Sequence, residues 1–159
     1  MTISTVAQGL FIADESVWSW RMKPVDVVEE TRVRVESDSD IVTARMRGRA
    51  LAAQLGFAPA MATLVATAIS ELARNILLYA KRGEIILTPI ERGELRGLSV
   101  VAHDLGPGIP DVTRAMQDGY STSGRLGLGL PGVRRLMDEF EISSNGGQGT
   151  RVTVKKWLD

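Results

Sequence analysis

Apolar residues recur with helical spacing through the middle of the chain. After Pro59 they lie three or four positions apart, at Met61, Val65, Ala68, Ile69, Leu72 and Ile76. This spacing predicts a helix over 59–80 that packs one apolar stripe against a sheet. Another helix is predicted over roughly 40–55, where Asp38-Ser-Asp40 supplies N-cap chemistry and Gly56 ends the helix.

Five segments have the alternation or the apolar content of β-strands, and they are residues 31–35, 84–90, 98–103, 140–144 and 150–157. The connection over 91–97 is short, polar and contains glycine, and Asn145-Gly-Gly-Gln-Gly149 is a turn sequence, so two hairpins are predicted. Adjacent antiparallel pairs mixed with helices favour an α+β fold. We expect a two-layer sandwich with a mixed, mostly antiparallel sheet and helices on one face.

The other segments divide the chain into an extension and one domain. Residues 1–28 have weak periodicity, and we interpret them as an N-terminal extension before a domain over 29–159. A short helix is predicted over 111–117 and a longer one over 130–139. Between them, residues 118–129 are polar and rich in glycine, which is typical of a loop.

Composition and charge exclude several classes of function. The 159 residues are enough for one domain, and 19 basic and 19 acidic side chains cancel, which argues against a broad nucleic-acid surface. Cysteine is absent, which excludes disulfides and thiolate metal sites. Residues 51–70 are uncharged, but Gln54 and the break Gly56-Phe-Ala-Pro59 indicate two helices and not a membrane span. We expect a cytoplasmic protein with neither nucleic acid nor membrane among its partners.

The first candidate for chemistry is Asp104-Leu-Gly-Pro-Gly-Ile-Pro110, which follows a predicted buried strand. Gly106 and Gly108 lack Cβ atoms where the backbone must turn sharply or approach a ligand closely. Pro107 and Pro110 fix φ, and Pro110 can open a helix. By itself, the segment fits a tight strand-to-helix turn equally well.

A second candidate is the pair Glu71 and Asn75, which are four positions apart in the predicted helix and so share a face. A carboxylate can act as a general base toward a hydroxyl or a water. An amide oxygen one turn later can bind Mg²⁺, which prefers hard oxygen ligands. The alternative for such a pair is a solvated helix surface.

The third candidate, Gly124-Arg-Leu-Gly-Leu-Gly129, precedes the helix predicted to begin near Pro131. Glycines free backbone amides to point at phosphate, and a helix N-terminus favours anions. The glycines formally satisfy G-x-G-x-x-G, but a polar segment precedes them instead of a strand, which excludes a dinucleotide-binding fold. No P-loop sequence occurs, and no kinase catalytic loop accompanies Asp104-Leu-Gly106. The alternative is an ordinary flexible connection.

Together these motifs resemble those of the GHKL ATPase and kinase superfamily. Its N, G1, G2 and final-strand motifs are similar to Glu71-x-x-x-Asn75, Asp104-x-Gly-x-Gly108, Gly124-x-x-Gly-x-Gly129 and Gly149-Thr150. The resemblance covers residues 29–159. Longer stretches resemble the RsbT-type switch kinases of bacterial stressosomes, and they are residues 69–80, 104–111, 118–124 and 130–140.

The resemblance implies a Bergerat-type site for ATP and Mg²⁺. In such a site Asp104 would accept a hydrogen bond from the adenine amino group, and Gly106 and Gly108 would let the backbone pass the base. Asn75 would hold Mg²⁺, and Glu71 would orient or deprotonate the attacking hydroxyl.

Further contacts are implied by the same resemblance. A lid over the phosphates would be formed by Gly124, Arg125, Leu126, Gly127, Leu128 and Gly129. Thr150 would lie near the adenine, and Tyr79 matches an aromatic residue that often follows the N motif. Related histidine kinases often have lysine where this chain has Leu78. The basic residue that reaches phosphate is therefore left open among Lys81, Arg82 and Arg125.

Two functions follow from the resemblance. The first is a serine/threonine protein kinase that phosphorylates STAS-domain proteins in a stress-signalling, partner-switching module and binds a downstream phosphatase. The alternative is a binding module similar to anti-sigma factors, which senses ATP versus ADP with little turnover. The same site serves both functions, so the motifs do not separate them.

Overall fold

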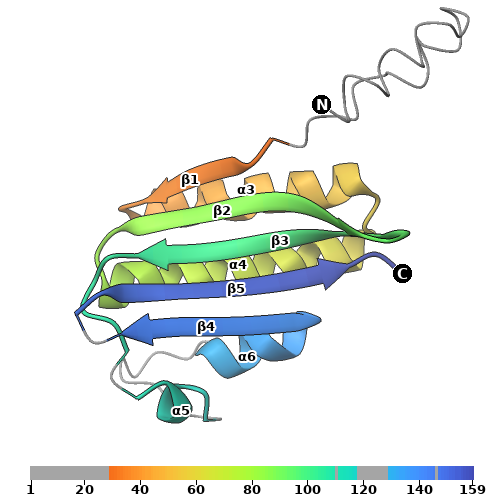
Figure 1. The fold of residues 1–159 in the computed structure, drawn as a ribbon. Coiled ribbons are helices and arrows are strands. Elements are labelled where there is room, and N and C mark those ends of the chain that lie inside the picture. The colour runs from red at the N-terminus through yellow and green to blue at the C-terminus, as the bar shows by residue number, and fades with distance from the viewer. Residues whose placement is uncertain (1–28, 110, 118–128, 146) are drawn as a thin grey trace, which may run out of the picture.

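The computed structural model describes residues 29–109, 111–117, 129–145 and 147–159. The predicted N-terminal extension, residues 110 and 146, and residues 118–128 of the predicted loop over 118–129 lie outside them. Five strands form one sheet in the order β1-β2-β3-β5-β4, and each of the four pairings between them is antiparallel. The three longer helices of the described residues cover the same face of the sheet (Figure 1). This arrangement is the predicted α+β two-layer sandwich.

The strands are β1 (Thr31–Val35), β2 (Gly83–Arg92), β3 (Leu95–Asp104), β4 (Glu139–Asn145) and β5 (Gly149–Trp157). The hairpin of β2 and β3 is longer than its apolar runs predict, since Glu91 pairs with Arg96 and Arg92 pairs with Leu95. Gly93 makes the tight turn with a φ of 61°, a conformation that glycine adopts at no steric cost. The predicted connection over 91–97 is therefore wrong. Backbone pairing continues past the buried core, where the side chains are in water and need no apolar character.

The helices are α3 (Asp38–Leu55), α4 (Pro59–Tyr79), α5 (Val112–Ala115) and α6 (Gly129–Leu136). The first of them begins before the predicted position because Ser37, and not Asp38-Ser-Asp40, is its N-cap residue. The Asp40 carboxylate accepts hydrogen bonds from the backbone N–H groups of Glu36 at 2.8 Å and Ser37 at 3.0 Å. At the other end of the chain, α6 stops short of the predicted residue 139 because that residue already belongs to β4.

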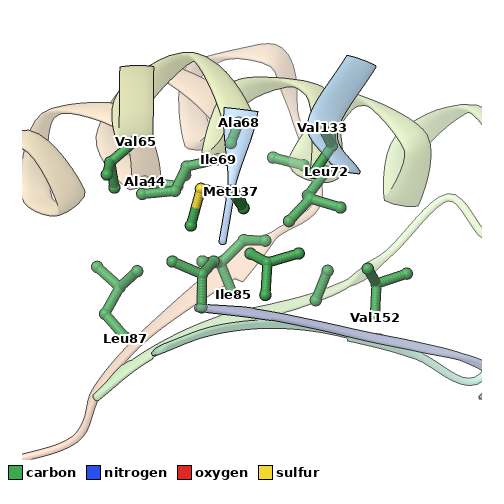
Figure 2. Close-up of a cluster of buried hydrophobic side chains, with 14 of the residues drawn as sticks. Ala44, Val65, Ala68, Ile69, Leu72, Ile85, Leu87, Val133, Met137 and Val152 are labelled. Carbon is green, nitrogen blue, oxygen red and sulfur yellow. The ribbon is translucent and has the colours of Figure 1, made fainter. Parts of the chain in front are cut away.

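The core lies between the helices and the covered face of the sheet (Figure 2). Ile69 and Leu72 of α4 are fully buried, as are Ile85 and Leu87 of β2. Fully burying one such side chain contributes about 1.5–3 kcal/mol. Of the described helices, only α4 is long and apolar enough to cross a membrane, and half of its apolar window is buried inside the fold. Its predicted apolar stripe is the face that it packs into the core.

Candidate functional site

The predicted motifs at Asp104 and at Thr150 meet at one end of the sheet, close to the end of α4. The C-terminal ends of α4 and β3 lie there beside the N-terminal end of β5 (Figure 1). Asp104 is the last residue of β3, and it pairs in register with Gly83 of β2 and with Thr150 of β5. The fold therefore places Asp104 and Thr150 side by side, as the final-strand motif requires.

Two glycines let the neighbouring strands approach Asp104 closely. A Cβ atom on Gly83 would lie 2.5 Å from the His103 carbonyl oxygen and 3.0 Å from Asp104 Cβ. A Cβ atom on Gly149 would overlap the carbonyl oxygen of Asp104, and Gly149 has a φ of 86°. Real side chains do not make contacts this short, so both positions require glycine.

The turn after Asp104 folds back on the carboxylate. The Gly106 N–H group donates a hydrogen bond to Asp104 Oδ1 at 2.9 Å. A Cβ atom on Gly106 would lie 2.6 Å from the Cβ atom of Ala80, which follows α4. Gly106 therefore has no room for a side chain because Ala80 lies against it. Gly108 has a φ of 78° and makes the sharp turn that the sequence predicts.

The half-buried Asp104 carboxylate keeps one oxygen available for a ligand. Its Oδ1 atom accepts from the Gly106 N–H group, and no described residue donates a hydrogen bond to its Oδ2 atom. A partly enclosed carboxylate oxygen is a strong acceptor for an N–H donor. The turn therefore orients the carboxylate and leaves Oδ2 to bind a donor group.

A hydroxyl network joins this turn to the hairpin of β4 and β5. The Ile109 N–H group donates to Ser144 Oγ at 2.7 Å, and Ser144 Oγ lies 2.9 Å from Thr150 Oγ1. The Gly147 N–H group also donates to the Pro107 carbonyl oxygen at 2.8 Å. Thr150 is among the site residues predicted from the sequence, and Ser144 is not. A serine near a strand end gives no signal of its own, and its partner Ile109 lies 35 positions away.

Glu71 and Asn75 lie one turn apart on α4, and both are partly buried. The Glu71 side chain is only 13% exposed, and its Oε1 atom accepts a hydrogen bond from Arg74 Nη1 at 2.7 Å. The alternative of a solvated surface pair is therefore wrong for Glu71. Arg74 is not among the predicted site residues, although its spacing of three residues from Glu71 is typical of a helical ion pair.

The residues that follow the N motif lie at the same end of the sheet. Tyr79 is 44% exposed at the end of α4, and Leu78 is 38% exposed. Lys81 and Arg82, two candidates for a phosphate contact, are exposed in the short connection that leads to Gly83 and thus to Asp104. Lys81 has a φ of 69°, which is uncommon for a residue other than glycine.

The glycine-rich motif is described only at its last residue. Gly129 begins α6 with a φ of 62°, and Val133 of this helix packs beside Leu72 of α4 (Figure 2). The other predicted lid residues lie outside the described part of the chain, and they are Gly124, Arg125, Leu126, Gly127 and Leu128. The site's contacts with phosphate therefore stay a prediction.

The donor set suits a cation that arrives together with a ligand. In the described ranges, no group of three or more histidine, aspartate or glutamate side chains is placed to hold a metal ion. Asn75 offers a hard amide oxygen atom, of the kind that Mg²⁺ prefers. Mg²⁺ usually takes one or two protein ligands and fills its other positions with waters and substrate phosphates. A single protein ligand at Asn75 fits that pattern.

Comparison with known proteins gives relatives over most of the chain. Residues 35–156 match a family model described as a histidine kinase-like ATPase domain. The serine/threonine-protein kinase RsbT of Bacillus subtilis is 50% identical over 130 residues, which cover 82% of this chain and 98% of that protein. An anti-sigma F factor of Caldanaerobacter subterraneus is 33% identical over 98 residues, which cover 59% of this chain and 68% of that protein.

Among solved structures, the mycobacterial sensor histidine kinase MprB is similar with a TM-score of 0.50. The match covers 82% of this chain and 97% of that chain, at 13% sequence identity. At this level of identity the likeness supports the fold alone.

Proposed function

The chain belongs to the family of histidine kinase-like ATPase domains, in the branch of the serine/threonine kinase RsbT, and from this membership we propose its function. It is a cytoplasmic serine/threonine protein kinase that uses ATP and Mg²⁺ and acts as a switch in a bacterial stress-signalling module. The observation that carries the proposal is the 50% identity along 98% of a serine/threonine kinase. The pairing of Asp104 with Thr150 also supports it. This pair lies near the end of α4, the helix that carries Glu71 and Asn75.

The partners belong to the same proposal. The relatives are a protein kinase and an anti-sigma factor, which supports a role in switching between protein partners. We assign STAS-domain proteins as the substrates and a downstream regulatory phosphatase as a second partner, on the resemblance to stressosome switch kinases.

The base end of the site is formed by the turn over 104–109. Asp104 Oδ2 accepts a hydrogen bond from the adenine amino group, while Oδ1 remains bonded to the Gly106 N–H group. Thr150, the register partner of Asp104, lies beside the base. A hydrogen bond to a charged acceptor is typically worth about 1.5–3 kcal/mol, so the carboxylate supplies a large part of the preference for adenine.

The chemical step transfers the γ-phosphoryl group to a serine or threonine hydroxyl. The bond between the γ-phosphorus and the bridging oxygen breaks, a bond to the hydroxyl oxygen forms, and ADP leaves. Glu71 orients the hydroxyl and accepts its proton, a role that contributes about 10²- to 10⁴-fold in general. Arg74 holds the Glu71 carboxylate in place through its bond of 2.7 Å. When bound, Mg²⁺ neutralises phosphate charge, with Asn75 as its protein ligand.

Phosphoryl transfer to candidate substrates tests this proposal. The protein is incubated with Mg²⁺ and γ-labelled ATP together with STAS-domain proteins from the same organism, and label on serine or threonine is measured. We expect transfer by the wild-type protein and a loss of about 10²- to 10⁴-fold in Glu71→Gln, with ATP affinity retained. No transfer to any STAS-domain protein by a protein that binds ATP would refute the kinase assignment.

The match to an anti-sigma factor favours one second candidate. In this function the site senses ATP versus ADP, and the protein sequesters a regulator with little turnover. The same labelling experiment separates the two functions, because a sequestering module binds its partner in an ATP-dependent complex without labelling it. Glu71→Gln would then leave complex formation unchanged.

A further inference from the structure

Ser144 joins three parts of the site that are distant in the sequence. Its Oγ atom accepts from the Ile109 N–H group at 2.7 Å, at the end of the turn that follows Asp104. The same Oγ atom lies 2.9 Å from Thr150 Oγ1 and 3.3 Å from the Gly149 carbonyl oxygen. Ser144, Ile109 and Thr150 are all half-buried, so water competes only partly for these bonds.

The number of hydroxyl protons in this network limits the hydrogen bonds that Thr150 can make to a ligand. A hydroxyl group has one proton to donate and two lone pairs to accept with. Ile109 N–H uses one lone pair of Ser144 Oγ, so the Ser144 proton goes either to Thr150 Oγ1 or to the Gly149 carbonyl oxygen. In the second case Thr150 must donate its own proton to Ser144, and it can then only accept from a ligand.

The distances favour donation from Ser144 to Thr150. Good O–H···O bonds are about 2.5–3.0 Å long, and the distance to Thr150 falls in this range at 2.9 Å. The distance to the Gly149 carbonyl oxygen is 3.3 Å, which is too long for a strong bond of this kind. Donation to Thr150 leaves the Thr150 proton free to point into the site.

We propose that Ser144 is a positioning residue for the base end of the nucleotide site. Its bond from Ile109 N–H fixes the turn that holds Asp104, and its bond to Thr150 makes Thr150 a donor toward an acceptor nitrogen of the purine. Asp104 then accepts from the adenine amino group while Thr150 donates to the ring. The inference rests on the proposed function, because ATP is the ligand.

Ser143 provides a matched control for this role. It is the preceding residue of the same strand, it pairs in register with Arg151, and its side chain is exposed. Its side chain makes no hydrogen bond to any described residue. Ser143→Ala therefore makes the same chemical change as Ser144→Ala, on the opposite face of β4.

The test compares Ser144→Ala, Ser144→Thr and Ser143→Ala with the wild-type protein. Calorimetry gives the affinities for ATP and ADP with Mg²⁺, and amide hydrogen exchange without nucleotide reports on the Ile109 N–H group. We expect Ser144→Ala to weaken ATP and ADP by the same factor, about fivefold to tenfold, because the base end is common to both ligands. Ile109 should exchange faster in this variant, Ser144→Thr should restore both properties, and Ser143→Ala should change neither.

The outcomes separate this inference from the proposed function. If the wild-type protein binds ATP but Ser144→Ala has unchanged affinities and an unchanged Ile109 exchange rate, Ser144 has no positioning role. A lower unfolding temperature with faster exchange throughout the domain and unchanged affinities would make Ser144 merely structural, which also overturns the inference. If the wild-type protein binds no ATP, the proposed function fails instead.

Discussion

Gly149→Ala should damage the site through its backbone contacts. Gly149 has a φ of 86°, and its added Cβ would overlap the Asp104 carbonyl oxygen and lie 2.9 Å from Leu105 Cα. The left-handed conformation costs an L-residue roughly 1–2 kcal/mol, and overpacking against backbone that cannot rotate away costs about 1–3 kcal/mol more. We therefore expect a destabilisation of about 2–5 kcal/mol.

Gly147→Ala separates the two contributions. Gly147 lies in the same hairpin with a φ of 83°, but nothing lies within 4 Å of an added Cβ atom. Gly147→Ala should lower the free energy of unfolding only by the cost of the left-handed conformation, about 1–2 kcal/mol. This loss corresponds to a fall in melting temperature of about 2–8 °C. Urea unfolding of both variants gives the difference in the free energy of unfolding.

The nucleotide affinity gives a second readout of the same perturbation. In Gly149→Ala the strand can relieve the overlap only by moving away from Asp104 and Leu105, so ATP binding should weaken in the folded fraction. Gly147→Ala should bind ATP like the wild-type protein. Equal destabilisation by the two substitutions would show that β5 does not press against Asp104 as the structure has it.

Three further predictions concern charged side chains. Glu71→Gln should keep the ATP affinity while transfer falls by about 10²- to 10⁴-fold, and equal single-turnover rates would exclude a catalytic role. Arg74→Met should slow transfer by about 10- to 100-fold with little change in ATP affinity, because it frees the Glu71 carboxylate to misalign; an unchanged transfer rate would contradict this role. At the far end of the sheet, hydrogen bonds from Arg92 and Trp157 lower the pKa of Glu139 from 4.5 to about 2, so its stabilising effect is present above pH 4.5 and is lost as the pH falls toward 2. Glu139→Gln should therefore flatten acid unfolding in this window, measured by circular dichroism, and an unchanged profile would contradict the assigned partners.

The fold could be predicted where the side-chain pattern follows burial. The apolar stripe of α4 is the clearest case, since Ile69 and Leu72 recur at helical spacing and face the core. Where backbone hydrogen bonds alone determine the length of a strand, the side-chain pattern does not predict its end. The hairpin of β2 and β3 continues through Glu91 and Arg92 because its hydrogen bonds do not depend on the polarity of the side chains.

The site could be predicted as far as its motifs are local. The glycines that follow Asp104 identify it as a candidate, and Thr150 is identified by its place at the start of the last strand. Ser144 and Arg74 could not be found in the same way. The first acts on a segment that precedes it by 35 residues, and the second has its effect through the geometry of one side-chain bond.

Calorimetric titration of ATP with Mg²⁺ into wild-type protein and Asp104→Asn tests most directly whether this end of the sheet binds adenine. Asparagine keeps an oxygen that can accept from Gly106 N–H and replaces the other carboxylate oxygen with an amide that cannot accept from the adenine amino group. Asp111→Asn is the matched control, since Asp111 caps α5 by accepting from Arg114 N–H.

We expect binding by the wild-type protein and by Asp111→Asn. In Asp104→Asn the affinity should fall by about 1.5–3 kcal/mol, with the thermal unfolding transition retained. Failure of the wild-type protein to bind ATP, or the same affinity in Asp104→Asn, would contradict the assignment of this site.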